Sequence, residues 1–266
     1  MITVIIPALN EEESILACLQ SLTSQTIPRD SYEIIVVDGG SSDNTCALAA
    51  TLADRVIMQT RPGIGGARGD GAEAANGDIL VFTDADTRHP STWLETIGEV
   101  LTNGEYDVCT GPVWFYNRTI RSCIIQGWRQ YYLLLHSFGF YWLIGSNFAV
   151  KKDRYVQTGG HRNISILEDY DLSLRLAESG ARCTFDRRTA VFTSARRLKG
   201  IVPYTGIYLT GFYHYHITGS EERLLKYPQP RIITFQRLPK SSDLKEAREK
   251  IAAAWCKLIL GGPRFD

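Results

Sequence analysis

The stretch VFTDADTRHP, residues 81–90, ends an apolar run with two aspartates. Val81 and Phe82 are typical of the end of a buried strand, and Asp84 and Asp86 follow within four residues. In an extended segment, side chains two residues apart point the same way, so these carboxylates would form a cluster. Such a cluster is costly unless a proton or a cation neutralises it. The stretch therefore indicates a strand whose end carries chemistry.

Upstream of this strand, the chain alternates apolar strands with helical segments. Strands are expected at residues 2–9, 33–38, 55–59 and 78–86, and helices at residues 10–25, 43–53 and 65–76. Near-continuous apolar strands separated by helices are typical of a parallel sheet covered on both faces, so the predicted fold class is α/β. Asn10, followed by Glu13, predicts a capping box at the start of the first helix.

Acidic residues fall at three of the predicted strand ends: Glu11, Asp38, and the pair Asp84 and Asp86. In open α/β sheets, ligands bind beyond the carboxyl ends of the strands. Each acid alone has a simpler interpretation as a cap or turn residue. Asp38, for example, could begin a tight turn in which Gly39 and Gly40 take positive φ. The three strand ends together predict a binding site at one edge of the sheet.

The paired aspartates are suited to a divalent cation. One or two carboxylates, completed by waters and substrate phosphates, are the ligands that Mg²⁺ and Mn²⁺ prefer. Such an ion could stabilise a nucleotide diphosphate as a leaving group. A D-x-D pattern alone is frequent by chance, and its place after the fourth strand of a βα array makes it more specific.

Composition excludes few classes of function. The chain has 266 residues, of which 44% are hydrophobic, enough for one large domain with or without an appendage. Its 29 basic residues balance 29 acidic ones, which argues against a nucleic-acid binder. Residues 182–240 contain eleven lysines or arginines and three acids. This excess suggests either an anionic partner on one side of the molecule or a solvated basic surface.

The cysteines and the first residues indicate a reducing compartment. None of the six cysteines forms a CxxC pair, so neither a zinc site nor a redox motif is predicted. The opening MITVIIPALNEEE has no basic stretch followed by a long apolar run, so we expect no signal peptide. We therefore expect a cytoplasmic protein, with a peripheral position on the inner face of a membrane as an open possibility.

The stretch ILEDYDLSLRLAESG predicts an amphipathic helix that ends at Gly180. Glu168 and Asp169 would lie in its first turn, where acids suit the helix dipole. A second interpretation is that Asp169 is a general base that deprotonates an acceptor hydroxyl. Asp171 and Arg175 have the i, i+4 spacing of a structural ion pair.

Two aromatic runs, residues 131–145 and 200–219, follow different patterns from the first half of the chain. Proline, glycines and histidines make residues 200–219 a poor membrane span, whereas tyrosines favour the interfacial region. The alternatives are ordinary core packing or a dimer contact. Residues 241–260 predict a terminal amphipathic helix with Ser or Asp at its cap.

Four stretches, in order, resemble the motifs of the family 2 glycosyltransferases of the GT-A fold: VIIPALNEEESI, IIVVDGGSSDNT, RPGIGGARGDGAEAANGDILVFTDADT and SILEDYDLSLRLAESG. DADTRHP is also similar to a segment of the polyprenyl-phosphate sugar synthases of this family. The resemblance covers about residues 2–180. It implies a Rossmann-like GT-A catalytic domain at 1–198, with a nucleotide-binding half at 1–90 and an acceptor half at 91–198. Residues 199–266 would form a C-terminal extension.

The resemblance also implies roles for individual residues. The nucleotide-sugar site would comprise Pro7, Ala8, Asn10, Glu11, Asp38, Gly39, Gly65, Arg68, Asp84 and Ala85. Asp86 with Asp84 would hold the metal, and Asp169, with Glu168 beside it, would be the base. Arg196 and Arg197 end a strand-like run, where forked donors can grip a diphosphate.

Some positions depart from the family pattern or have no clear role. Asp70 stands where the family commonly has a nearby asparagine. Arg88 follows the D-x-D where some relatives supply a further metal ligand, which arginine cannot be. His89 is expected to be structural. His214 or His216 could complete a metal shell, with a packed histidine as the alternative.

The predicted function is an inverting, metal-dependent glycosyltransferase. It would use Mg²⁺ or Mn²⁺ and a UDP-sugar, or next a GDP-sugar, and an acceptor hydroxyl or phosphate such as a polyprenyl phosphate or lipid-linked sugar. A nucleotidyltransferase is one alternative, although the loop PALNEEE lacks the glycine-rich basic character of that class. A non-catalytic nucleotide-sugar-binding protein is the other, and the presence of both DAD and ED argues against it. A homodimer remains open, and no nucleic-acid partner is expected.

Overall fold

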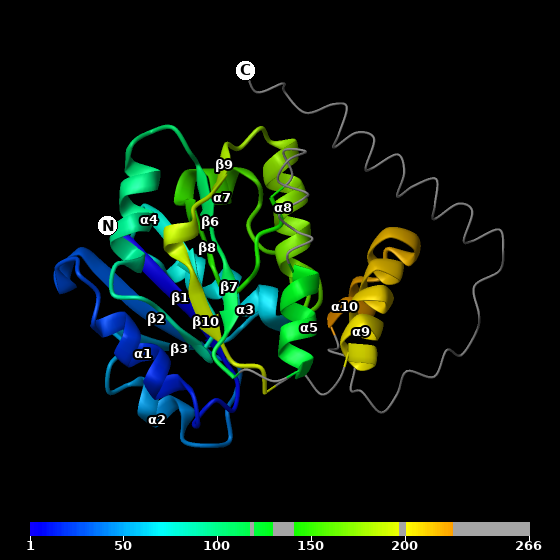
Figure 1. The fold of residues 1–266 in the computed structure, drawn as a ribbon, viewed down its shortest axis with the longest axis horizontal. Helices are drawn as coiled ribbons and strands as arrows, with labels where there is room; N and C mark the ends of the chain where they lie inside the picture. The colour runs from blue at the N-terminus through cyan, green and yellow to red at the C-terminus, as the bar shows by residue number, and fades with distance from the viewer. Residues whose placement is uncertain (118–119, 130–140, 197–200, 226–266) are drawn as a thin grey trace.

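The computed structural model describes residues 1–117, 120–129, 141–196 and 201–225 (Figure 1). The predictions for residues 131–140, for Arg197 and for the terminal helix at 241–260 lie outside these residues. In the part that the structure describes, cysteines 18, 46, 109, 123 and 183 are all free.

A seven-stranded sheet with the order β3-β2-β1-β4-β8-β6-β9 forms the centre of the molecule. Its strands are β1 (Ile2–Ala8), β2 (Tyr32–Asp38), β3 (Arg55–Met58), β4 (Ile79–Phe82), β6 (Val108–Thr110), β8 (Phe148–Lys151) and β9 (Cys183–Phe185). The pairs are parallel except where β8 runs antiparallel to β4 and β6. The predicted mostly parallel α/β sheet is confirmed.

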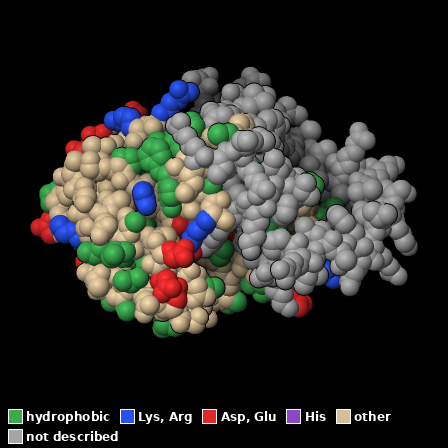
Figure 2. All heavy atoms as spheres, turned by 60° about the horizontal axis from the view of Figure 1, so that its bottom comes forward, with side chains coloured by type: hydrophobic (Ala, Val, Ile, Leu, Met, Phe, Trp, Pro, Cys, Tyr) green, Lys and Arg blue, Asp and Glu red, His purple; other side chains and the backbone are tan. Residues whose placement is uncertain are grey.

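Helices lie between these strands and after the last of them. They are α1 (Ile15–Thr23), α2 (Thr45–Ala49), α3 (Gly63–Ala74), α4 (Trp93–Thr102), α5 (Ile120–Arg129), α7 (Lys152–Gln157), α8 (Glu168–Glu178), α9 (Ile201–Tyr213) and α10 (Glu221–Leu225). Short 3-10 turns lie at η1 (Arg29–Ser31) and η2 (Arg187–Thr189), and a π-helix, η3 (His214–Thr218), continues α9. Seen from the side where α1 and α2 lie, the described surface mixes acidic, basic and hydrophobic side chains (Figure 2).

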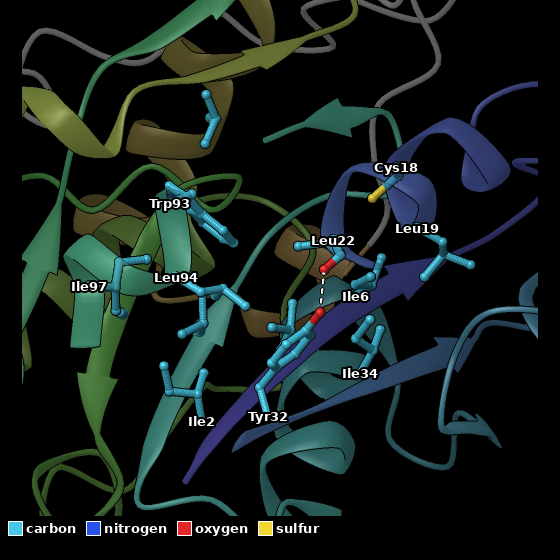
Figure 3. Packing of buried hydrophobic residues seen from close by; sticks show 14 of the residues in the cluster. Ile2, Ile6, Cys18, Leu19, Leu22, Tyr32, Ile34, Trp93, Leu94 and Ile97 are labelled. Atoms are coloured by element: carbon cyan, nitrogen blue, oxygen red, sulfur yellow. Dashed lines mark hydrogen bonds between the residues drawn. The ribbon is translucent and has the colours of Figure 1, made fainter. Parts of the chain in front are cut away.

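The central strands divide the core into two layers because alternate side chains point to opposite faces. On β1, Val4 and Ile6 join one cluster, which includes buried residues of α1 and α4, while Ile5 joins the other, which includes residues of α3 and α8. Figure 3 shows the first cluster, where the Tyr32 hydroxyl donates to the Leu22 carbonyl at 2.7 Å. Both faces of the sheet are therefore covered, as predicted.

A second, three-stranded sheet has the order β5-β10-β7. It comprises β5 (Thr87–Arg88), β10 (Val191–Thr193) and β7 (Val113–Phe115). The strand-like run at 190–193 is confirmed in β10, whereas the other two strands were not predicted. Because β5 begins directly after Asp86, this sheet brings residues from near position 193 to the D-x-D segment.

Three local predictions were wrong. β4 ends at Phe82, and residues 84–87 form a turn in which Thr87 N–H donates to Asp84 O at 3.1 Å, so Asp84 and Asp86 are not on an extended segment. The first helix begins at Ile15, without the capping box at Asn10 and Glu13, because Asn10 takes a left-handed φ of 53° instead. Only Gly40 (φ 89°), and not Gly39, has positive φ after β2.

Part of the second aromatic run packs against α8 and the loop before it. Phe212 and Tyr215 are partly buried against a cluster that includes Ile166 and Tyr170, and the Ile166 amide donates to Leu224 O at 3.1 Å. Leu209, in contrast, is 65% exposed. In the part of the chain that the structure describes, no helix combines the length and apolarity needed to cross a membrane. The predicted division into 1–198 and 199–266 stays a prediction.

The contact of α3 with the sheet gives a test of this packing. A Cβ added at Gly71 would lie 2.4 Å from Cγ2 of Ile5 and 3.0 Å from Cγ2 of Val37. We expect Gly71→Ala to lower the free energy of unfolding by about 1–3 kcal/mol through overpacking.

Gly98 in α4 is the matched control, because a Cβ there would meet only Ile2 Cδ1, at 3.8 Å. Gly98→Ala is expected to raise the free energy of unfolding by up to about 1 kcal/mol through helix propensity. Urea denaturation of both variants measures the difference. Equal effects of the two substitutions would contradict the close packing of α3.

Candidate active site

The three acidic strand ends lie side by side. β1 pairs with β2 on one side and β4 on the other, with Ala8 opposite Asp38 and Ile5 opposite Phe82. The Gly39 amide donates to the Ala8 carbonyl at 2.8 Å, which fastens the ends of the first two strands together. The sequence predicted this convergence from the order of strands and helices.

Hydrogen bonds join the loops after β1 and β2. The Asn10 side chain accepts from the Ser42 amide at 2.9 Å, and the Asn10 amide donates to Ser41 Oγ at 2.9 Å. The buried Glu11 receives its own support, because its amide donates to Thr45 Oγ1 at 2.7 Å. The left-handed backbone of Asn10 is one that asparagine tolerates better than most residues. These hydrogen bonds therefore hold the two loops together beside the ends of β1 and β2.

Asp38 is held as an ionised acceptor. Its Oδ2 accepts from the amides of Gly40 and Ser41, both at 2.9 Å. Burial opposes ionisation, but the hydrogen bonds from Ser41 and Gly40 outweigh it and lower the pKa of Asp38. Neither amide hydrogen bond reaches Oδ1. The carboxylate can therefore accept a hydrogen bond from an N–H group of a ligand.

Arg68 of α3 is buried between two carboxylates. Its Nη2 donates to Asp84 Oδ1 at 2.8 Å and its Nη1 to Glu168 Oε1 at 2.5 Å, while its side chain is 2% exposed. A Cβ at Gly145 would lie 2.4 Å from Nη2, so only glycine leaves room for this guanidinium. Arg68 thus connects the end of β4 with the first turn of α8.

Gly65, predicted near the nucleotide, packs beneath the loop that precedes α8. Its amide donates to Ile164 O at 2.9 Å, and a Cβ there would lie 2.1 Å from Arg162 O. The glycine is required by this close approach of two backbones, whether or not it also contacts a ligand.

Asp86 lies against the small sheet. Its Oδ1 accepts from Thr193 Oγ1 at 3.2 Å, and its Oδ2 is 3.5 Å from Arg196 Nε. Arg196 also forms an ion pair with Glu11. The arginine therefore bridges the loop after β1 and the D-x-D segment. The Ala85 side chain between the aspartates packs into the core.

Asp169 lies in the first turn of α8, where backbone amides hold its carboxylate. Its Oδ1 accepts from the Tyr170 amide at 2.7 Å and its Oδ2 from the Gly145 amide at 3.1 Å. Leu167, the residue before α8, has φ 62°, an uncommon left-handed conformation for a branched side chain. Such strain persists only where the surrounding structure imposes it and is frequent at functional sites.

Glu168 and Asp169 are neighbouring acids in a buried setting. Burial, and next the charge of Asp169, raise the pKa of Glu168 to about 8, against the opposing charge of Arg68. Burial also raises the pKa of Asp169, while Arg68 and the Gly145 amide act in the other direction. Since two adjacent carboxylates resist double ionisation, a proton held by one favours the charged form of the other.

The carboxylates of Asp84 and Asp86 are suitable ligands for a divalent cation that is also coordinated by a substrate. In the described ranges, no group of three or more His, Cys, Asp or Glu side chains gathers into a complete protein shell. Cys18 Sγ lies 3.6 Å from the Asp84 carbonyl oxygen, and burial, then the charges of Asp86 and Asp84, raise the pKa of this thiol. Two nearby carboxylates suit Mg²⁺ or Mn²⁺ in the mode where substrate phosphates supply further ligands.

Both late histidines have other neighbours. His214 Nδ1 is 3.1 Å from Thr218 Oγ1, and His216 Nε2 is 3.2 Å from the Tyr170 hydroxyl. Stacking on Phe212 holds the His216 ring. The structure does not bring these residues to Asp86 through any contact of the described chain, and the packed interpretation accounts for their position.

The remaining predicted residues have structural partners. Asp70 accepts from the amides of Thr60 and Arg61, at 2.5 and 3.0 Å, and holds the turn before α3. Pro7 and Ala8 lie at the end of β1. The Asp171–Arg175 ion pair is confirmed at 2.5 Å.

Sequence reasoning missed Thr193, Gly145 and Leu167. Thr193 reaches Asp86 across 107 positions of sequence, and Gly145 reaches Asp169 across 24. No local pattern marks either contact, because each depends on how distant strands and loops pack. A positive φ at leucine also has no signal in the sequence.

The chain is similar in sequence to known glycosyltransferases. Residues 3–153, more than half of the chain, match the sequence model described as Glycosyl transferase family 2. Glycosyltransferase AglE of Haloferax volcanii is 38% identical over 120 residues, 43% of this chain and 40% of that protein. Dolichol-phosphate mannosyltransferase of Pyrococcus furiosus is 32% identical over 139 residues, 50% of this chain and 38% of that protein. The matched part spans about two fifths of either relative.

Solved structures share the fold. Mannosyltransferase PcManGT from Pyrobaculum calidifontis, in complex with GDP-Man and Mn²⁺, has a TM-score of 0.64 at 23% identity, covering 96% of this chain and 75% of that chain. Glucosyl-3-phosphoglycerate synthase from Mycobacterium tuberculosis, in complex with Mg²⁺ and UDP, has a TM-score of 0.62 at 20% identity, covering 80% and 78%. These similarities confirm the GT-A form of the α/β fold.

His89 lies close to the D-x-D turn, and the change of protein stability with pH tests whether its ring is buried there. Its ring nitrogens lie 3.0 Å from Ser21 Oγ and 2.8 Å from Thr83 Oγ1, and burial lowers its pKa to about 3 from an ordinary value near 6.5. Between these values the unfolded chain binds a proton that the folded chain does not. Stability is therefore lost as the pH falls from 6.5, by up to about 1.4 kcal/mol per pH unit.

We expect His89→Gln to lower the slope of the free energy of unfolding with pH by the equivalent of about one bound proton, because glutamine does not titrate. Urea denaturation of the wild type and the variant at pH 7 and pH 5 measures the slope. The same slope in both proteins would show that His89 titrates normally in the folded state.

Proposed function

The chain belongs to glycosyl transferase family 2, and on this premise we propose that it is an inverting, cation-dependent glycosyltransferase. It transfers a sugar from a nucleotide-diphosphate sugar to an acceptor hydroxyl or phosphate. The observation that carries the proposal is the connection through Arg68 between Asp84 of the D-x-D segment and the Glu168–Asp169 pair. Donor-side carboxylates and a candidate base are thereby held in one site.

The nucleotide is proposed to bind beyond the ends of β1 and β2. Asp38 is an ionised acceptor, which suits the N–H groups of a uracil or guanine base. Arg196 lies between Glu11 and Asp86, where its forked donors would grip a diphosphate. The donor is proposed to be a UDP-sugar, with a GDP-sugar as the next candidate. Thermal stabilisation by a panel of nucleotide sugars distinguishes them, because ligand binding to the folded state raises its stability.

Asp86 and Asp84 are proposed to hold the Mg²⁺ or Mn²⁺. When bound, the cation supplies positive charge that stabilises the departing nucleotide diphosphate. Arg68 keeps Asp84 in place through the hydrogen bond to its Oδ1. Thr193 supports Asp86 in the same way. The chain's own contribution is therefore to fix both carboxylates before the donor arrives.

Asp169 is proposed to be the base of a single displacement at the anomeric carbon. The acceptor hydroxyl would give its proton to a carboxylate oxygen of Asp169 as its oxygen forms the new bond and the nucleotide diphosphate departs. The amides of Gly145 and Tyr170 fix this carboxylate. With a phosphate acceptor, already largely ionised at neutral pH, Asp169 would orient the acceptor and remove little or no proton.

The acceptor is proposed to be lipid-linked, for example a polyprenyl phosphate. Support comes from the basic excess between residues 182 and 240 and from the name of the Pyrococcus relative, dolichol-phosphate mannosyltransferase. Phe212 and Tyr215 do not add to this support, because they pack against the α8 region. Peripheral contact with the membrane follows from such an acceptor.

The cation site is tested with Asp86→Asn. We expect the variant to fold and to lose most metal-dependent binding of UDP and GDP, because the substitution removes a negative ligand. Thermal shift or calorimetric titration with and without Mn²⁺ measures the loss.

Asp78→Asn is the matched control, because the Asp78 side chain is 91% exposed at the other end of β4. It should bind nucleotide as the wild type does. Unchanged metal-dependent binding by the Asp86 variant would remove the cation site from the proposal.

The base is tested with Asp169→Asn, which should keep donor affinity and lower turnover by about a hundredfold or more. Since the pKa of Asp169 is raised, activity should be lost at a higher pH than for an ordinary aspartate as the pH falls. Because the pKa of Glu168 is raised to about 8, this side chain is already uncharged where Asp169 titrates, so Glu168→Gln should leave this acidic limb in place.

Steady-state rates from pH 4.5 to 8 measure both effects. Glu178→Gln, on the exposed end of α8, is the control and should leave the profile unchanged. Near-normal turnover by the Asp169 variant would reduce Asp169 to a helix-terminal residue, and absence of turnover in the wild type with every donor would favour a non-catalytic binding protein.

A further inference from the structure

The small sheet β5-β10-β7 has two unlike faces. Along each strand the side chains alternate between buried and exposed positions, as a pleated strand requires. The inner face consists of buried side chains: Thr87, Val113, Phe115, Val191 and Thr193. The outer positions are Arg88, Trp114, Phe192 and, just after β7, Tyr116. We call these four residues the outer aromatic face.

The strand register assembles this face from three distant parts of the sequence. Phe192 pairs with Arg88 on one side and with Trp114 on the other, so the three form a row across the strands. The Arg88 guanidinium lies over the Tyr116 ring, 4.6 Å from its centroid. Trp114 is 39% exposed and Phe192 is 42% exposed.

The chemistry of this face is unusual for a sheet face in contact with water. The exposed face of a sheet ordinarily carries polar side chains, whereas this one carries three aromatic rings and an arginine. Contiguous exposed apolar side chains with a polar rim are typical of an interaction surface. Packing within the protein leaves these side chains partly exposed to solvent, so the face is available to a partner.

The charged residues in and around the outer aromatic face indicate which kind of partner it binds. None of the four residues is acidic, and Arg187, shortly before β10, is exposed. Tryptophan and tyrosine favour the headgroup level of a bilayer, where one end of the ring is apolar and the other is wet. Arginine binds phosphate through paired donors. Aromatic rings with a cationic surround fit the surface of an anionic bilayer.

We propose that the outer aromatic face docks on the headgroup region of an anionic phospholipid bilayer. Trp114 and Phe192 enter the interface, and Arg88 binds lipid phosphate. The inner face of the same sheet holds Thr193 against Asp86, so docking brings the D-x-D segment within one sheet thickness of the lipid. The proposal rests on the proposed function in one respect: a lipid-linked acceptor would reach this site from the docked bilayer.

Vesicle sedimentation of the full chain tests the docking without donor or turnover, so its failure is distinct from failure of the glycosyltransferase assignment. The probes are vesicles of phosphatidylcholine alone and of phosphatidylcholine with about a third phosphatidylglycerol. We expect binding to the anionic vesicles that weakens with salt, because exposed charges are screened over about 8 Å at physiological ionic strength. Trp114→Ser with Phe192→Ser should weaken this binding at least about tenfold.

Arg88→Gln should weaken binding to the anionic vesicles about fivefold and reduce its salt dependence. Two controls carry matched changes elsewhere: Val156→Ser, at a 64% exposed position of α7, and Arg55→Gln, at an exposed position of β3. Both should bind as the wild type does. Thermal unfolding checks that every variant is folded.

Three results would overturn the proposal. The wild type could ignore both kinds of vesicle, or the double variant could bind as tightly as the wild type. The wild type could also self-associate without lipid in sedimentation equilibrium while the double variant does not, in which case a second copy of the chain covers the face.

Discussion

The ion pairs of Arg68 are the interaction on which the site depends. A buried guanidinium is costly unless carboxylates pair with it, and here Asp84 pairs with Nη2 and Glu168 with Nη1. The arrangement fixes the end of β4 relative to the first turn of α8. It also explains Gly145, since any side chain there would occupy the space of the guanidinium. Two halves of the site, distant in sequence, are thereby held at one separation.

The same charges divide the acids into different roles. Backbone amides stabilise the ionised form of Asp38, whose pKa is lowered, whereas burial and a like charge raise the pKa of Glu168 to about 8. Carboxylates whose environments push their pKa values apart are suited to different tasks in one site. Arg196 offsets Glu11 and Asp86 in the same way that Arg68 offsets Asp84 and Glu168. The proposed cation would add to charges that the fold already balances in pairs.

The small sheet links the site to the surface. Its inner face packs into the core and supports Asp86, while its outer face exposes Trp114 and Phe192. The aromatic side chains of α9 and η3 have a different use, because Phe212, Tyr215 and His216 pack around Tyr170 on α8. Aromatic residues near the site therefore fall into two groups, one that stabilises the fold and one that is open to a partner.

The sequence by itself determined the α/β class, the parallel strands β1 to β4 and the meeting of Glu11, Asp38 and Asp84 at one edge. Apolar strands that alternate with helices leave few other arrangements, and parallel strands place their carboxyl ends together. It also predicted α8 and the ending at Gly180, whose φ of 73° favours glycine.

Only the tertiary structure decided the turn at Asp84–Asp86, the burial of Arg68 and the contact of Thr193 with Asp86. The contacts of Arg68 with Glu168 and of Thr193 with Asp86 join residues 100 and 107 positions apart, a spacing that leaves no local period in the sequence.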